Sequence, residues 1–163
     1  METNRYILSI LVDNEPGVLS RISGLFSGRG FNIDSLSVAK TADPQVSVIT
    51  MVTFCDAHVI EQIKKQLHKL INVITVNDLT QKEYVERELA LIKVHAKTEK
   101  RAEIMRMVDI FRSKIVDVGA SHFIVEVSGD SGKINAFVEL MKPMGIVEIA
   151  STGTIALGRE NGK

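Results

Sequence analysis

The stretch Tyr6-Ile7-Leu8-Ser9-Ile10-Leu11-Val12-Asp13-Asn14-Glu15-Pro16-Gly17-Val18-Leu19 decides the fold. Residues 6–12 are short, apolar and rich in β-branched side chains, and Asp13-Asn14 bounds them, which predicts a buried strand. Pro16 then suits the first turn of a helix, where its missing N–H costs nothing. Apolar residues follow at the spacing of one helical face: Val18, Leu19, Ile22, Leu25 and Phe26. The stretch therefore predicts a strand, a turn and an amphipathic helix.

The rest of the chain extends this unit and then repeats its order. The first half predicts strands over residues 33–41, 46–54 and 73–79, with a second helix over residues 60–71. The second half predicts strands over 88–96, 115–118, 123–127 and 146–157, with helices over 104–111 and 134–141. We expect the last strand to bend or break at Gly153.

Each half thus reads as strand, helix, strand, strand, helix, strand, the split β-α-β pattern. The predicted class is α+β, with two ferredoxin-like βαββαβ sandwiches in tandem. The expected boundaries are residues 1–79, a polar linker at 80–87, and residues 88–163. We expect the helices to cover one face of each sheet. Four hydroxyl residues would leave the other face of the first sheet only partly polar: Ser9, Ser37, Ser47 and Thr53. Such a small sandwich favours an oligomer.

Composition excludes several protein classes. The 163 residues carry 20 basic and 20 acidic side chains, so the basic excess of a nucleic-acid-binding protein is missing. Cys55 is the only cysteine, so an intrachain disulfide is impossible and a reducing compartment is expected. We see no signal peptide, and no apolar stretch approaches the roughly 20 residues that span a bilayer. A cytoplasmic protein without a membrane or nucleic-acid partner is expected.

No catalytic or metal-binding constellation is visible. The four histidines do not share metal-ligand spacing: His58, His68, His95 and His122. Cys55 has no evident histidine partner, so an inert thiol is expected. The Gly28–Ile33 segment ends a predicted helix instead of opening one, so it is not a dinucleotide-binding turn. The Gly129–Ile134 segment resembles a phosphate-binding loop but lacks the closing Ser or Thr, and we interpret Gly132 as the start of a helix.

The turn at Asn14–Val18 is the one candidate binding site. Unpaired N–H groups at residues 17–19 would carry the positive end of the helix dipole, which suits a carboxylate. Gly17 leaves those groups accessible. The amide of Asn14 offers a donor and an acceptor for a free amino acid. Asn14 as a simple helix cap and Gly17 as an ordinary turn glycine are the alternatives.

The order of elements and the segment Leu11–Arg21 resemble the ACT domain, a small amino-acid-sensing module. More narrowly, two segments resemble the small regulatory subunits of acetolactate synthase: Asn14–Arg21 and Gly24–Leu36. The segment Leu67–Val73 agrees, and the second half agrees through Val85–Leu89, Phe111-Arg112, Ile115–Val118 and Ser131–Phe137. The resemblance runs almost end to end, whereas an ACT domain alone explains only the first half.

The resemblance implies a non-catalytic subunit that activates a separate large subunit and confers feedback inhibition by valine in branched-chain amino acid biosynthesis. It implies a homodimer in which Asn14, Pro16, Gly17 and Val18 of one chain line the effector site. Asn32 and Ile33 would approach from the other chain. Val18 and Ile33 would contact the branched side chain of the effector. Thiamine diphosphate, magnesium and FAD would belong to the large subunit, because this chain offers no site for them.

A free-standing amino-acid sensor, controlling another enzyme or a transcription factor, is the alternative. It would use the same Asn14–Gly17 turn and would differ in its partner. The second half of the chain discriminates between the two, because a lone sensor has no need of it.

Overall fold

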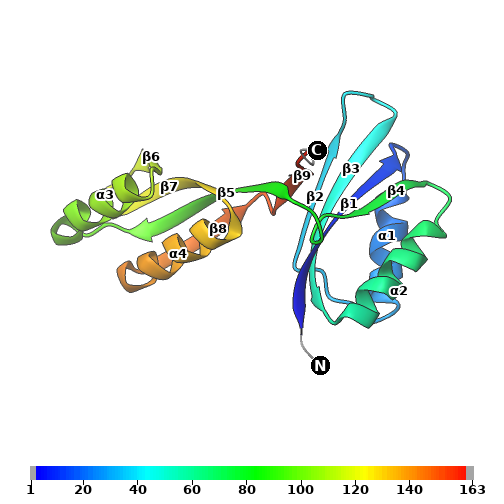
Figure 1. Cartoon of the computed structure of the whole chain (residues 1–163). Coiled ribbons are helices and arrows are strands. Elements are labelled where there is room, and N and C mark those ends of the chain that lie inside the picture. Colours follow the sequence, from blue (N-terminus) through cyan, green and yellow to red (C-terminus); the bar gives the residue numbers. More distant parts are fainter. Residues whose placement is uncertain (1–2, 161–163) are drawn as a thin grey trace. The chain divides into compact units, whose positions relative to one another are not determined.

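The computed structural model describes residues 3–160, which form two compact units (Figure 1). The first unit comprises the described part of Met1–Val85 together with that of Thr154–Lys163. The second unit is Glu86–Gly153. Among the described residues, no helix is long and apolar enough to cross a membrane.

The first unit has the predicted βαββαβ order. Its elements are β1 (Asn4–Asp13), α1 (Val18–Ser27), β2 (Ser35–Lys40), β3 (Val46–Cys55), α2 (Ala57–His68) and β4 (Val73–Asp78). The strands form an antiparallel sheet in the order β2-β3-β1-β4, and α1 and α2 lie together against one face of it (Figure 1). Asp56 caps α2 by accepting a hydrogen bond from the N–H of Val59.

The core of the first unit lies between this sheet and its two helices. Alternate residues of β1 point into it, with Leu8 and Ile10 fully buried, and directly opposite them on β3 lie Met51 and Ile49. Phe26 closes the core from α1. Period-two burial on the strands and helical spacing on α1 are the two patterns that the sequence carries, so the fold expectation is confirmed here.

The second unit repeats the architecture. Its elements are β5 (Tyr84–His95), α3 (Arg101–Ile110), β6 (Lys114–Val118), β7 (His122–Gly129), α4 (Ser131–Met141) and β8 (Ile146–Ser151). The first two residues of β5 belong to the first unit. The strand order is β6-β7-β5-β8, which matches that of the first sheet. Asp130 caps α4 by accepting from the N–H of Lys133 at 2.8 Å. The Gly129–Ile134 segment is therefore a helix cap, and Gly132 lies in the first turn of α4, as expected.

The C-terminal residues differ from the boundaries expected from sequence. The predicted last strand is broken at Gly153, which has φ 72°, and β9 (Ile155–Gly158) is grouped with the first unit. The N–H of Thr154 donates to Ser35 Oγ at 3.3 Å. Ala156 is buried against Ile7 and Val52, on the sheet face that α1 and α2 do not cover.

The expected linker at residues 80–87 is also ordered. β5 begins at Tyr84, inside that stretch, and Tyr84 packs against the same small cluster as Ala156. β9 pairs with β5, and the N–H of Arg159 donates to the carbonyl of Glu83 at 2.7 Å. The polar composition of residues 80–87 therefore gave no sign that a strand begins at Tyr84.

Candidate functional site

The turn between β1 and α1 is built around Gly17. Gly17 is the N-cap of α1, with φ 86° and ψ −8°, and no side chain caps the helix. This left-handed backbone is costly for residues with a Cβ, which explains the glycine. A Cβ placed at this position would meet no atom within 4 Å. The position that a side chain at Gly17 would occupy is therefore open.

The first turn of α1 presents free donors to that space. Among the described residues, the N–H groups of Leu19 and Ser20 have no hydrogen-bond partner, and the N–H of Val18 makes only a long contact of 3.4 Å with the carbonyl of Glu15. Pro16 is exposed beside them. Free N–H groups at the positive end of a helix dipole attract anions. The turn thus presents unpaired N–H groups where the sequence predicts a carboxylate site, and binding of a carboxylate there stays a prediction.

Asn14 bridges this turn to the turn between β2 and β3. Its Nδ2 donates to the carbonyl of Pro44 at 2.8 Å, and its Oδ1 accepts from Ser47 Oγ at 3.2 Å. Asn14 is therefore not the helix cap that was the simplest alternative. One amide N–H and one acceptor site of its exposed side chain remain available to a ligand.

Asn32 and Ile33 lie beyond the other end of α1. The carbonyl of Asn32 accepts a hydrogen bond from Thr53 Oγ1 at 2.6 Å. The Asn32 side chain is exposed, and Ile33 packs partly against the core. A ten-residue helix is about 15 Å long, so one chain does not bring Asn32 next to Gly17.

Ser47 and Thr53 lie on the opposite sheet face from the one expected. They pair with Val12 and Tyr6 on the face that the helices cover, and both are buried. The expectation was wrong because β3 alternates apolar and hydroxyl residues on both of its faces, which leaves its orientation ambiguous. The two hydroxyls fasten the chain segments that contain Asn14 and Asn32.

Val18 is only 4% exposed and belongs to the core. Its side chain is therefore committed to packing against the sheet, and what it offers to a ligand is its backbone N–H. Val18 therefore has little side-chain surface left for a ligand. Ile33 is half-buried, so its side chain is better placed for an apolar contact with a ligand.

Asn72 is a positioning residue that the sequence did not single out. It is 8% exposed, and its Oδ1 accepts a hydrogen bond from the guanidinium of Arg21. Its Nδ2 lies 3.4 Å from Asp13 Oδ2 and 3.3 Å from Glu15 Oε2. The network links Arg21 of α1 to Asp13 and Glu15. Asn72 lies 59 residues from Asp13, so no local pattern could have revealed the contact.

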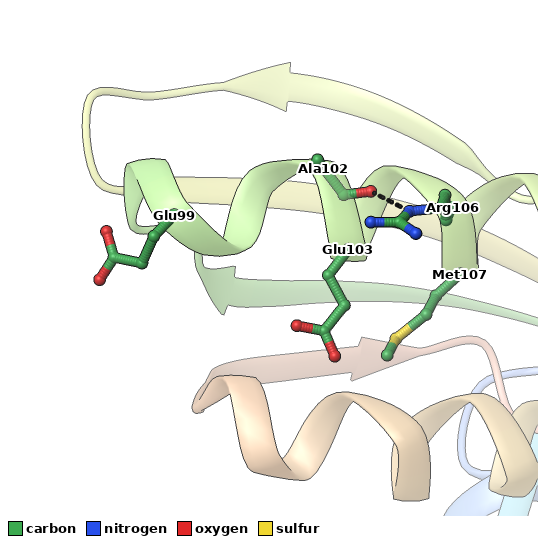
Figure 2. Close-up of a pocket in the computed structure, with 5 residues that line it drawn as sticks. All are labelled: Glu99, Ala102, Glu103, Arg106 and Met107. Carbon is green, nitrogen blue, oxygen red and sulfur yellow. Dashed lines mark hydrogen bonds between the residues drawn. The ribbon is translucent and has the colours of Figure 1, made fainter.

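Two other features within residues 3–160 carry potentially reactive groups, a hollow with two carboxylates and the thiol of Cys55. A hollow of about 450 Å³ lies beside α3, and its lining includes Glu103 and also Glu99 of the short 3-10 helix Thr98–Lys100. Figure 2 shows the side chains that line it. Glu103 is paired with Lys100 at 2.9 Å. Within residues 3–160, no group of three or more His, Cys, Asp or Glu side chains could hold a metal ion. Burial, followed by the nearby carboxylates of Asp56 and Asp78, raises the pKa of the Cys55 thiol, which agrees with its expected inertness.

Comparison with known proteins places both units in one family. A family model described as the small subunit of acetolactate synthase matches residues 87–160. A second, described as an AHAS small subunit-like ACT domain, matches residues 8–75. A probable acetolactate synthase small subunit of Archaeoglobus fulgidus is 50% identical over 159 residues, which cover 98% of this chain and 99% of the relative.

Two further relatives agree over nearly the whole chain. The small subunit of acetolactate synthase isozyme 3 of Escherichia coli is 48% identical, over 95% of this chain and 96% of its own. The crystal structure of the acetolactate synthase small subunit of Thermotoga maritima matches with a TM-score of 0.88 and 40% identity, over 98% of this chain and 99% of that one. The expected resemblance and the two-sandwich fold are both confirmed.

Proposed function

Because this chain belongs to the family of acetolactate synthase small subunits, we propose that it activates a catalytic large subunit and makes that enzyme sensitive to valine. Membership makes it a regulatory subunit of an enzyme of branched-chain amino acid biosynthesis. The observation that carries the effector proposal is the open turn at Gly17 with free helix N–H groups. The family match over the second unit favours this function over a free-standing sensor.

The chemistry of the turn suits a zwitterion. The N–H groups of Val18, Leu19 and Ser20 would receive the carboxylate of the amino acid. Asp13 and Glu15 place two acidic side chains at the same turn, where they would favour the ammonium group. The remaining donor and acceptor of Asn14 can serve either end. An amino acid, which carries both charges on adjacent atoms, uses such a site better than a simple anion does.

The apolar part of the site is proposed to come from a second copy of the chain. Asn32 and Ile33 follow the far end of α1, so they are too distant from Gly17 to complete the binding site within one chain. In a homodimer joined through the edges of the first sheets, the Asn32 segment of one copy would face the Asn14 turn of the other. β2 is an edge strand of this sheet, so it can pair with a neighbouring chain. Ile33 would then meet the branched side chain of valine.

Catalysis is proposed to reside entirely in the large subunit. Thiamine diphosphate, magnesium and FAD would bind there, and this chain would contribute no catalytic residue. We also propose a cytoplasmic location, together with the rest of the enzyme.

The direct test of activation is reconstitution with the large subunit. We expect the pure chain, supplied with pyruvate, thiamine diphosphate and magnesium, to form no acetolactate. We expect the two subunits to co-purify, and the turnover of the large subunit to rise when this chain is added. Product formation by the pure chain would contradict a purely regulatory role, and unchanged turnover in a stable complex would contradict activation.

A further inference from the structure

Four basic side chains line a hollow on α2 and the turn after α1, and no acidic side chain is among the described residues that line it. The hollow there measures about 450 Å³ and is lined by Arg29, Gln62, Lys65, Gln66, His68 and Lys69. We call these four basic residues, Arg29, Lys65, His68 and Lys69, the α2 basic patch. All four are exposed. The chain as a whole has no net charge, so the patch is a local concentration.

In the part of the chain that the structure describes, the neighbouring Lys64, unlike the lysines of the patch, has acidic ion-pair partners. Lys64 forms ion pairs with Glu61, and with Asp78 at 3.3 Å, and its hydrogen bond to Glu61 is the largest cause of its raised pKa. Among the described residues, no ion pair is found for Arg29, Lys65 or Lys69. The charge of Lys64 is therefore balanced by ion pairs within residues 3–160, whereas the charges of Arg29, Lys65 and Lys69 are not.

The geometry of the patch disfavours a small anion. α2 ends at His68 with Lys69 as its C-cap, so the backbone presents carbonyl groups there, at the negative end of the helix dipole. Phosphate sites instead use the N–H groups of a helix N-terminus. The dipole favours a cation such as Lys65 in the last turn of α2. It does not explain Arg29, which lies in the turn after α1.

Exposed, flexible cations without backbone donors suit a protein surface of opposite charge. Charge complementarity at the rim of an interface speeds association and selects the partner. We infer that the α2 basic patch docks on an acidic surface of the large subunit. This inference rests on the proposed function, because it takes the large subunit as the partner.

The test compares two charge-reversal variants in the reconstituted enzyme. Lys65→Glu/Lys69→Glu should raise the concentration of this chain needed for half-maximal activation by at least about 10-fold at about 0.05 M salt. The effect should shrink to about 3-fold or less at about 0.5 M salt, where charges are screened over a few ångströms. Maximal activation at saturation should remain, because the patch acts on association.

The matched control is Lys82→Glu/Arg159→Glu. It changes the net charge equally and within the same unit, at a separate hollow shared with Ser9 and Asn77 on the sheet face that the helices do not cover. Equal weakening by both variants, or by neither, would overturn the inference. So would inorganic phosphate below about 1 mM shifting the amide signals of Lys65 and Lys69 in the free chain, because that marks a small-anion site. Failure of the wild-type chain to activate would instead refute the proposed function.

Discussion

Gly17→Asp is expected to abolish most of the response to valine while leaving activation of the large subunit largely intact. The new carboxylate would stand where the valine carboxylate is proposed to bind. Two like charges about 4 Å apart repel by about 1 kcal/mol in water and about 4 kcal/mol at an effective dielectric constant of 20. The new side chain also obstructs the free N–H groups. The valine concentration for half inhibition should therefore rise between about 10-fold and about 1000-fold.

The backbone at Gly17 requires a matched control for that experiment. Its φ of 86° strains any side chain, although Asn and Asp tolerate this conformation best. Gly17→Asn has nearly the same shape and the same strain without the charge. Valine inhibition curves of the two reconstituted variants separate the effect of the charge from the effect of backbone strain. The Asp variant should be clearly less sensitive to valine than the Asn variant. Two unchanged curves with intact activation would move the effector site away from this turn.

Removal of the returning C-terminal segment is expected to destabilise the first unit. A chain ending at Gly153 loses Ala156, which helps to cover Ile7 and Val52, each only 1% exposed. Fully exposing two such side chains costs about 3–6 kcal/mol. Because Leu79 and Tyr84 would still cover part of the cluster, we expect a loss of about 3 kcal/mol.

Amide hydrogen exchange measures this loss unit by unit. Protection of β1 and β3 should fall in the chain ending at Gly153, whereas the core of the second unit, for example at Ile92, should keep its protection. A chain ending at Glu160 retains β9 and is the control. Equal protection of β1 and β3 in both truncated chains would show that residues 154–160 are not part of the first unit.

An element could be predicted from the sequence when the residues that determine it lie close together in the chain. The β1–α1 segment was predictable because strand alternation, Pro16 and the helical spacing after Gly17 agree over a few residues. The break at Gly153 was predictable for the same reason. The return of residues 154–158 to the first unit was not, since it depends on Ile7 and Val52, which lie more than 100 residues away in sequence.

The candidate site was predictable to a similar degree. A strand followed by Asn-Glu-Pro-Gly and an apolar helix indicates an open helix N-terminus, and Gly17 has the backbone that such a turn needs. The bond from Ser47 to Asn14 and the buried Asn72 could not be foreseen. Both contacts join segments that are distant in sequence. In addition, β3 carries hydroxyl residues on both faces, so the sequence did not show that Ser47 points toward the helices.

Valine titration of the isotope-labelled chain, followed by its backbone amide NMR signals, tests the central claim most directly. About eight non-hydrogen atoms at about half the limiting ligand efficiency give about −6 kcal/mol, or a dissociation constant of tens of micromolar. The account predicts saturable shifts at Gly17, Val18 and Leu19, and matching shifts at Asn32, because a second copy completes the site. Saturable shifts elsewhere, or none below about 10 mM valine, would contradict it.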